Sequence, residues 1–151
     1  MTESYDNSKT IAYAELAIWG AKIRPHEITE ILGLVPTFYN EIGDQCKLNG
    51  RHYVCATWEF KTEEITLIED ISEPLNDLIA IFQTSINSLV KIKKNYKNCS
   101  ITIRIVVHNN QEILPGISLT PKQISFLASI GAGIDYDIYQ NVYAYVNKGL
   151  L

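Results

Sequence analysis

The spacing of hydrophobic residues along the chain predicts several β-strands. Residues 11–20 indicate one strand, and residues 51–60 alternate between apolar and polar positions as a half-buried strand does. Residues 100–108 form a nearly continuous β-branched run, which is typical of a central strand. We expect residues 112–118 to pair with that run as a hairpin, and residues 134–139 to form a last strand. The buried face of the second strand is expected to carry His52, Val54, Ala56, Trp58 and Phe60.

Helical spacing is clearest over residues 72–95, where a single long helix is predicted. Ser72 suits the N-cap position, and Pro74 falls in the first turn, where proline is tolerated. Acidic residues lie near the start of the segment and lysines near its end, as the helix dipole favours. The apolar positions at helical spacing are Leu75, Leu78, Ile79, Phe82, Ile86, Leu89 and Val90.

A thirteen-residue pattern occurs twice, at residues 20–32 and 116–128. Each copy indicates the end of a strand followed by the start of a helix with proline at its first position. In the second copy Thr120 and Gln123 have the spacing of a capping box, whereas Arg24 in the first copy cannot accept the same hydrogen bond. Two interpretations remain open: a junction that recurs by chance, or an internal duplication. The glycine, proline and isoleucine positions that match are Gly20 and Gly116, Pro25 and Pro121, and Ile28 and Ile124.

The order of the predicted elements indicates an α+β fold. We expect helices on one face of a mostly antiparallel sheet, in a ferredoxin-like arrangement or as two pseudo-duplicated β-α-β halves. The polar residues 1–10 are expected to form a flexible arm, and residues 11–151 a single domain. Within it, the pseudo-repeats would span residues 11–62 and 99–140, joined by the long helix.

Composition excludes some classes of function. The formal net charge of −4 argues against nucleic acid as the main partner, because phosphate contacts require clustered Lys and Arg. The sequence has no run of 18 apolar residues and starts with a polar segment, so neither a membrane partner nor a secretory signal is expected. The odd number of cysteines, with no close pair, favours the reducing cytoplasm.

Catalytic motifs are not found in the sequence. The nearest metal-like pair, Cys46 with His52, is short of the four ligands of a zinc site, and a buried thiol beside a packed histidine explains it better. Nucleophile-elbow, P-loop and dinucleotide patterns are missing as well. We therefore predict no catalytic residue, no metal and no cofactor.

Candidate binding residues are found in the last predicted strand and in an acidic stretch. Asp135, Asp137 and Tyr139 have the i, i+2, i+4 spacing that places side chains on one strand face. A solvated outer face is the favoured interpretation. Acid–base or cation chemistry and a recognition surface are the alternatives. Glu69 and Asp70 lie in the acidic stretch 63–77, which either is a solvated loop and helix start or attracts a basic partner.

Several short motifs, in order along residues 12–140, resemble the bacterial domain of unknown function 4279 family. The first are Ile28-Thr29-Glu30-Ile31-Leu32-Gly33-Leu34-Val35-Pro36-Thr37, then Gly43-Asp44 and Trp58. The later ones are Leu127-Ala128, Gly131-Ala132 and Ile134-Asp135-Tyr136-Asp137-Ile138-Tyr139. The resemblance implies a compact cytoplasmic α+β domain without an established activity, and it supplies no catalytic residues.

The leading functional hypothesis is a non-enzymatic protein-interaction module. Its specific form is an immunity- or antitoxin-like protein that masks a basic surface of its partner. The alternative is a small-molecule or metabolite-sensing domain with a pocket between the two halves. An enzyme that uses Asp135 and Asp137 would require a concave site containing both. A homo-oligomer could form through an exposed edge strand at the C-terminal tail.

Overall fold

One mixed β-sheet organises the chain in the computed structural model, which describes residues 9–111 and 113–140. The strands are β1 (Ile11–Gly20), β2 (Phe38–Asn40), β3 (Ala56–Lys61), β4 (Ile65–Thr66), β5 (Ser100–Asn109) and β6 (Gly133–Gln140). Their order is β2-β3-β1-β5-β6, and β4 extends the pairing of β1 beyond β3. All neighbours are antiparallel except β5 and β6, which run parallel.

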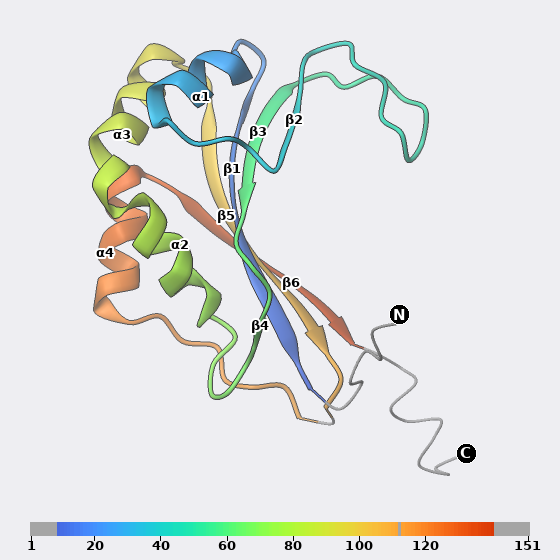
Figure 1. Cartoon of the computed structure of the whole chain (residues 1–151), viewed down its shortest axis with the longest axis vertical. Helices are drawn as coiled ribbons and strands as arrows, with labels where there is room; N and C mark the ends of the chain where they lie inside the picture. The colour runs from blue at the N-terminus through green and yellow to red at the C-terminus, as the bar shows by residue number, and fades with distance from the viewer. Residues whose placement is uncertain (1–8, 112, 141–151) are drawn as a thin grey trace.

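The helices cover one face of this sheet, as Figure 1 shows. They are α1 (Pro25–Leu32), α2 (Pro74–Phe82), the short 3₁₀ helix η1 (Gln83–Ser85), α3 (Ile86–Asn95) and α4 (Pro121–Ile130). The predicted α+β class, with a mostly antiparallel sheet, is therefore confirmed. The parallel strands β5 and β6 lie next to each other, whereas a ferredoxin-like split unit would place another strand between them.

The hydrophobic core lies between the sheet and the helices. Alternate residues of β1 and β5 point into it, because successive side chains of a strand face opposite ways. Trp58 of β3 is fully buried there, and its indole N–H donates to Thr29 Oγ1 of α1 at 3.0 Å. The strand residues of this face are Ala12, Ala14, Leu16, Ile18, Ala56, Trp58, Ile101, Ile103, Ile105 and Val107.

Residues 41–55 form a projecting loop between β2 and β3, seen at the upper right of Figure 1. The loop extends away from the helices, and Ile42, Leu48 and Val54 on it are exposed. Predicted strand 51–60 therefore begins only at Ala56. Val54 is 83% exposed instead of buried, since the residues before Ala56 belong to this loop. Within residues 37–50, Phe38–Asn40 form the short strand β2.

The long helix predicted over residues 72–95 is interrupted, and this prediction was wrong in its continuity. The helix begins at Pro74 and breaks after Phe82 into η1, then continues as α3. The break falls on the polar run Gln83-Thr84-Ser85, whose Thr and Ser side chains are poor helix formers because they compete for backbone hydrogen bonds. Apolar faces are buried on both sides of it, at Phe82 and at Leu89.

The hairpin predicted between residues 112–118 and the central strand does not form. Both edges of β5 are already occupied, by β1 on one side and β6 on the other. β6 reaches its place through the crossover helix α4, as parallel neighbours require. Gly116 instead accepts a hydrogen bond from the Ile71 amide through its carbonyl, in an isolated bridge with Asp70.

The repeated pattern produces similar helices in dissimilar surroundings. Gly33 and Gly131 end α1 and α4 in the left-handed conformation. Gly20 ends β1, and a Cβ there would lie 3.0 Å from the Asn98 carbonyl oxygen; Gly116 lies in a loop with ordinary space around it. The strand after α1, β2, is separated from β1 by β3, whereas β6 pairs directly with β5. Duplication stays a prediction. Residues 1–8 of the predicted N-terminal arm and residues 141–151 lie outside the described residues, whereas Thr10 of that arm is buried and its hydroxyl donates to Asn109 Oδ1 at 2.7 Å.

Replacing Thr120 by Ala is expected to lower the free energy of unfolding by about 1 kcal/mol. The Thr120 hydroxyl accepts from the Gln123 amide (3.2 Å), and the Gln123 side chain accepts from the Thr120 amide (2.9 Å). Urea denaturation would measure the loss. Arg24→Ala is the matched control, because Arg24 occupies the same position of α1 without a side-chain cap. Equal losses in the two variants would contradict the capping role of Thr120.

Candidate functional site

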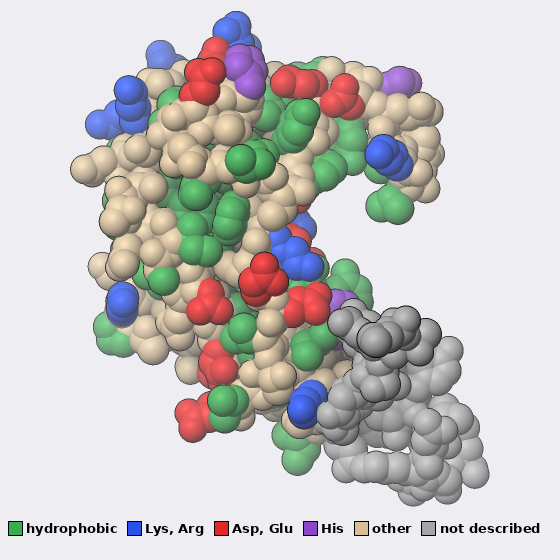
Figure 2. All heavy atoms as spheres, viewed as in Figure 1, with side chains coloured by type: hydrophobic (Ala, Val, Ile, Leu, Met, Phe, Trp, Pro, Cys, Tyr) green, Lys and Arg blue, Asp and Glu red, His purple; other side chains and the backbone are tan. Residues whose placement is uncertain are grey.

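The face of the sheet that the helices do not cover is the candidate site, here called the open face. Figure 1 shows all the helices on the other side, and Figure 2 shows the molecule hollowed below the projecting loop, with charged side chains in the hollow. The open face consists of Tyr13, Glu15, Ala17, Trp19, Thr57, Glu59, Lys61, Thr102, Arg104, Val106, His108, Asp135, Asp137 and Tyr139, placed together by the strand register.

A row of charged residues crosses the middle of the open face. Lys61, Glu15, Arg104 and Asp135 are aligned across four neighbouring strands. Arg104 Nη1 lies 3.2 Å from Glu15 Oε2, and Arg104 Nε lies 3.3 Å from Asp137 Oδ2. Arg104 therefore neutralises two carboxylates that come from different strands. The pair of Arg104 with Asp137 is largely exposed and contributes little to stability, whereas the Glu15 side chain is only 16% exposed.

Aromatic side chains surround this row. The Lys61 ammonium lies 3.7 Å from the centre of the Tyr13 ring, and His108 stacks on Tyr139 with ring centres 5.3 Å apart. The Trp19 indole N–H donates to Thr102 Oγ1 at 3.3 Å, and Trp19 is 43% exposed. Burial, and then the nearby Glu15 carboxylate, raise the pKa of Tyr13. Rings that are partly exposed and held by polar contacts are typical of binding surfaces.

The open face carries an excess of negative charge. Its carboxylates are Glu15, Glu59, Asp135 and Asp137, and its full cations are Lys61 and Arg104, which gives a formal net charge of −2. Glu59 is partly buried and forms no ion pair within the described part of the chain. Burial, and then repulsion from Glu15, raise the pKa of Glu59, although Arg104 partly offsets this. A cation brought near Glu59 would therefore be stabilised.

The structure separates the five predicted binding residues into two groups. Asp135, Asp137 and Tyr139 lie on the open face, on the side of β6 opposite Ile134 and Tyr136, which pack against the core. Glu69 and Asp70 lie in the loop before α2, next to elements of the helix layer. The site residues that sequence reasoning missed are Tyr13, Glu15, Trp19, Glu59, Lys61 and Arg104. The sequence signal for them was a charged residue inside a mostly apolar strand, Glu15 in β1 and Arg104 in β5.

Asp70 has a structural role in the loop before α2. Its carboxylate accepts from the Ser72 amide (2.8 Å) and from the Ser118 hydroxyl (2.6 Å), which ties this loop to the segment that leads into α4. Partial burial acts to raise the pKa of Asp70, but these hydrogen bonds outweigh it and hold the pKa below its ordinary value. Glu69 is exposed, and its amide donates to Glu73 Oε1. Its side chain thus stays open to solvent.

Acidification is expected to weaken the fold through Asp70 and Glu73. Burial opposes ionisation of both groups, but hydrogen bonds keep both pKa values below their ordinary 3.8 and 4.5. Their stabilisation is therefore complete above those ordinary values and is lost as the pH falls through the lower folded-state values. Urea denaturation at pH 7, 5, 4 and 3 measures this. Asp70→Asn should lower the free energy of unfolding at pH 7 and make it fall less steeply as the pH is lowered. Glu30→Gln, a substitution of an exposed residue, is the control. If the two variants lost stability equally steeply on acidification, the role of Asp70 would be contradicted.

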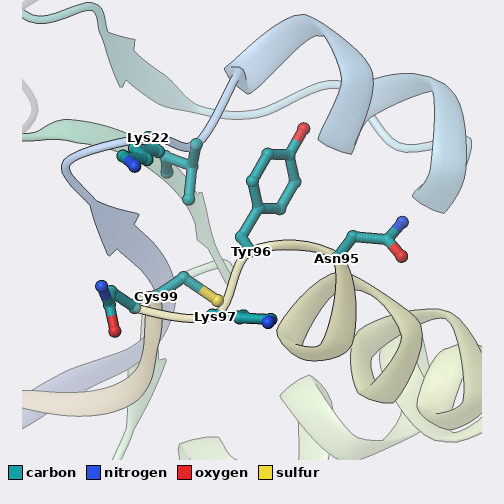
Figure 3. A pocket seen from close by; sticks show the side chains of 7 residues that line it. Lys22, Asn95, Tyr96, Lys97 and Cys99 are labelled. Atoms are coloured by element: carbon teal, nitrogen blue, oxygen red, sulfur yellow. The ribbon is translucent and has the colours of Figure 1, made fainter.

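Recesses in the described part of the chain include one beside the projecting loop and one near helices α1 and α3. A groove of about 750 Å³ lies between β2 and the projecting loop, lined by Phe38, Asn40, Asp44, Cys46 and Tyr53 among others. A smaller cavity of about 300 Å³ lies between the turn after β1 and the turn before β5 (Figure 3), with Lys22, Tyr96, Lys97 and Cys99 in its wall.

The smaller cavity is closed on one side by a link between two helices. The Tyr96 hydroxyl, after α3, donates to Glu27 Oε2 of α1, and Arg24 Nη1 lies 2.9 Å from the other Glu27 oxygen. Burial and this hydrogen bond raise the pKa of Tyr96 to about 12. Lys22 and Lys97 make the cavity basic. It is therefore suited to an anion, in contrast to the acidic open face.

Within residues 9–111 and 113–140, no group of three or more His, Cys, Asp or Glu side chains is placed to hold a metal ion. Asp137 is held by Arg104, and Asp135 is exposed, so the two carboxylates that could have served acid–base chemistry lack a common enclosed site. None of the helices in this part of the chain has the length and apolar character needed to cross a membrane.

Comparison with known proteins gives one match. The sequence model of a family described as a domain of unknown function (DUF4279) matches residues 9–141, which covers most of the chain. No curated protein and no solved structure matches. The match includes every strand of the described sheet and every helix that packs on it. The open face and both recesses therefore lie within the matched region.

Proposed function

Since this chain belongs to the domain of unknown function 4279 family, whose description assigns no activity, we propose a function from the open face. The protein is a non-enzymatic interaction module that binds a partner with a basic surface. The observation that carries the proposal is the uncovered sheet face with its excess of carboxylates and its partly exposed aromatic rings.

Electrostatic complementarity supports a basic partner. The carboxylates of Glu15, Glu59, Asp135 and Asp137 outnumber the cations of the open face, and opposite charges across an interface speed association and exclude wrong partners. The partly buried Glu59 carboxylate would gain most, because it has no counter-ion of its own among the described residues.

The size and charge of the chain favour a specific form of this proposal. A protein of 151 residues with a net charge of −4 is suited to act as an immunity- or antitoxin-like inhibitor in the cytoplasm, where it would mask a basic functional surface of a toxin. The exposed Ile42, Leu48 and Val54 of the projecting loop add apolar contact area beside the acidic face.

Affinity purification from the native host tests the proposal. The wild type should retain a basic protein in about equal amount, and 0.5 M salt should weaken the complex, because screening shortens the reach of the charges to about 4 Å. The variant Asp135→Lys/Asp137→Lys should lose the same protein. A chain that purifies alone at near-native expression, or a partner retained equally by the variant, would overturn the proposal.

The smaller cavity favours a second candidate function, a metabolite-sensing domain. It lies where residues 22–23 of the first predicted pseudo-repeat (11–62) meet residues 95–99, which lead into the second (99–140). Its lysines would attract an anionic metabolite. A thermal-shift screen over phosphate- and carboxylate-bearing metabolites tests this. Binding should raise the melting temperature of the wild type but not of Lys22→Gln/Lys97→Gln. The absence of any shift would remove this candidate and leave the open face as the site.

A further inference from the structure

The groove between β2 and the projecting loop is walled by aromatic rings. Its volume of about 750 Å³ lies within the range of small-ligand sites. Phe38, Tyr39 and Tyr53 line it, and the Phe38 and Tyr53 rings lie 6.5 Å apart at an angle of 57°. Phe38 is paired with Glu59 across β2 and β3, so this wall shares the open side of the sheet. A cation within about 6 Å of such rings is attracted to their faces.

One polar atom at this groove has no partner. Asn40 is 3% exposed and lines the groove, and its Nδ2 donates to the carbonyls of Cys55 (2.7 Å) and Glu41 (3.3 Å). Its Oδ1 is the buried side-chain atom left without a hydrogen bond within the described ranges. A buried acceptor without a donor costs about 1–3 kcal/mol, so a donor that reached Asn40 Oδ1 would be stabilised.

Carboxylates flank the same rings. Asp44 lines the groove, and Glu59 lies opposite Phe38 in the register of β2 and β3. The hydrogen bond to Cys46 and burial raise the pKa of Tyr53, and the charges of Glu59 and Asp44 raise it further. Lys47, which is exposed, is the opposing charge on the wall. The groove therefore combines ring faces, negative charge and an unused acceptor, all of which suit a cation that carries N–H donors.

We propose that this groove receives an arginine side chain of the basic partner. A guanidinium is planar and stacks on aromatic rings, and its five N–H donors can serve a carboxylate and Asn40 Oδ1 together. A lysine ammonium is a strongly hydrated point charge and suits the rings less well. Because Asn40 Oδ1 is buried in this structure, a hydrogen bond from the guanidinium to it requires the projecting loop to move. The arginine belongs to the partner of the proposed function, so the site depends on that function.

Calorimetric titration with three peptides tests the site: hexa-arginine, hexa-lysine and hexa-citrulline, the last being the neutral analogue of arginine. Hexa-arginine should bind most tightly and hexa-citrulline least. Glu59→Gln and Phe38→Leu should each weaken hexa-arginine by about tenfold. Glu30→Gln, the same charge change on an exposed residue of α1, is the matched control and should bind as the wild type does. Thermal unfolding confirms that each variant is folded.

Alkylation of Cys46 supplies a readout inside the groove. Cys46 lines the groove, and the Tyr53 hydroxyl bonded to its thiol lowers its pKa. Hexa-arginine should slow modification of Cys46 by iodoacetamide several-fold, with Cys55 and Cys99 as internal references in the same mass spectrum. If hexa-arginine did not change the rate of Cys46 modification, or if Glu59→Gln and Phe38→Leu bound hexa-arginine as the wild type does, the proposed arginine site in the groove would be overturned. If the groove fails these tests but Asp135→Lys/Asp137→Lys abolishes binding of hexa-arginine, only the groove proposal is overturned, and the proposed function of the open face stands.

Discussion

Truncating Trp58 to alanine is expected to lower the free energy of unfolding by about 3–5 kcal/mol. Trp58 is fully buried between β3 and α1, and its removal leaves a cavity that the surrounding sheet and helix fill only in part. The substitution also removes the hydrogen bond from the indole to Thr29 Oγ1, so a polar group of α1 loses its partner. Urea denaturation followed by circular dichroism measures the loss, and a variant that does not fold at 25 °C agrees with the same expectation.

Trp19→Ala is the matched control, because Trp19 lies on the opposite face of the sheet and is 43% exposed. It should change the free energy of unfolding by less than about 1 kcal/mol, as expected for an exposed position. It should, however, weaken binding of the basic partner, since an aromatic ring is removed from the open face. Equal destabilisation by the two substitutions would contradict the assignment of one covered and one open face.

Reversing two charges of β6, in Asp135→Lys/Asp137→Lys, is expected to lower the affinity for the basic partner by about a hundredfold, or about 2.7 kcal/mol. The change turns the net charge of the open face from −2 to positive and sets like charges opposite the partner. Stability should change little, because Arg104 keeps its contact with Glu15 at 3.2 Å. Titration calorimetry at two salt concentrations measures the affinity.

The control variant for this reversal is Glu30→Lys/Asp77→Lys. It changes the total charge of the chain equally, but both residues are exposed on helices α1 and α2 of the covered side. Its affinity should stay within about threefold of the wild type, because the salt-screened reach of a charge is about 8–10 Å. If the control loses as much affinity as the β6 variant, total charge decides binding and the open face does not.

Local chemistry made several elements of the fold predictable. Proline at the first helical position, a glycine after the last, and the Thr120–Gln123 capping box place α1 and α4 at the observed bounds. The strand ending at Gly20 and the central β-branched strand were also predicted, because their periodicity is a local property. The parallel pairing of β6 with β5 was not, since it depends on the path of α4 over the sheet rather than on residues within either strand.

The candidate site was predictable only in part. The alternation of Asp135, Asp137 and Tyr139 on one side of β6 follows from the period of a strand and is confirmed. Their neighbours could not be inferred, because Arg104 meets Glu15 across 89 residues of sequence through the register of β1 and β5. Asp70 was misleading for the opposite reason: a carboxylate in an acidic stretch resembles a charged surface, but local hydrogen bonds to Ser72 and Ser118 occupy it.

The two tryptophan indole N–H signals test directly whether the open face binds a basic partner. Trp19 lies on the open face and Trp58 in the core, and the chain has no other tryptophan. In a ¹H–¹⁵N correlation spectrum titrated with hexa-arginine, the Trp19 signal should move with added peptide while the Trp58 signal stays in place. A stationary Trp19 signal at saturating peptide, or movement of Trp58 alone, would contradict it.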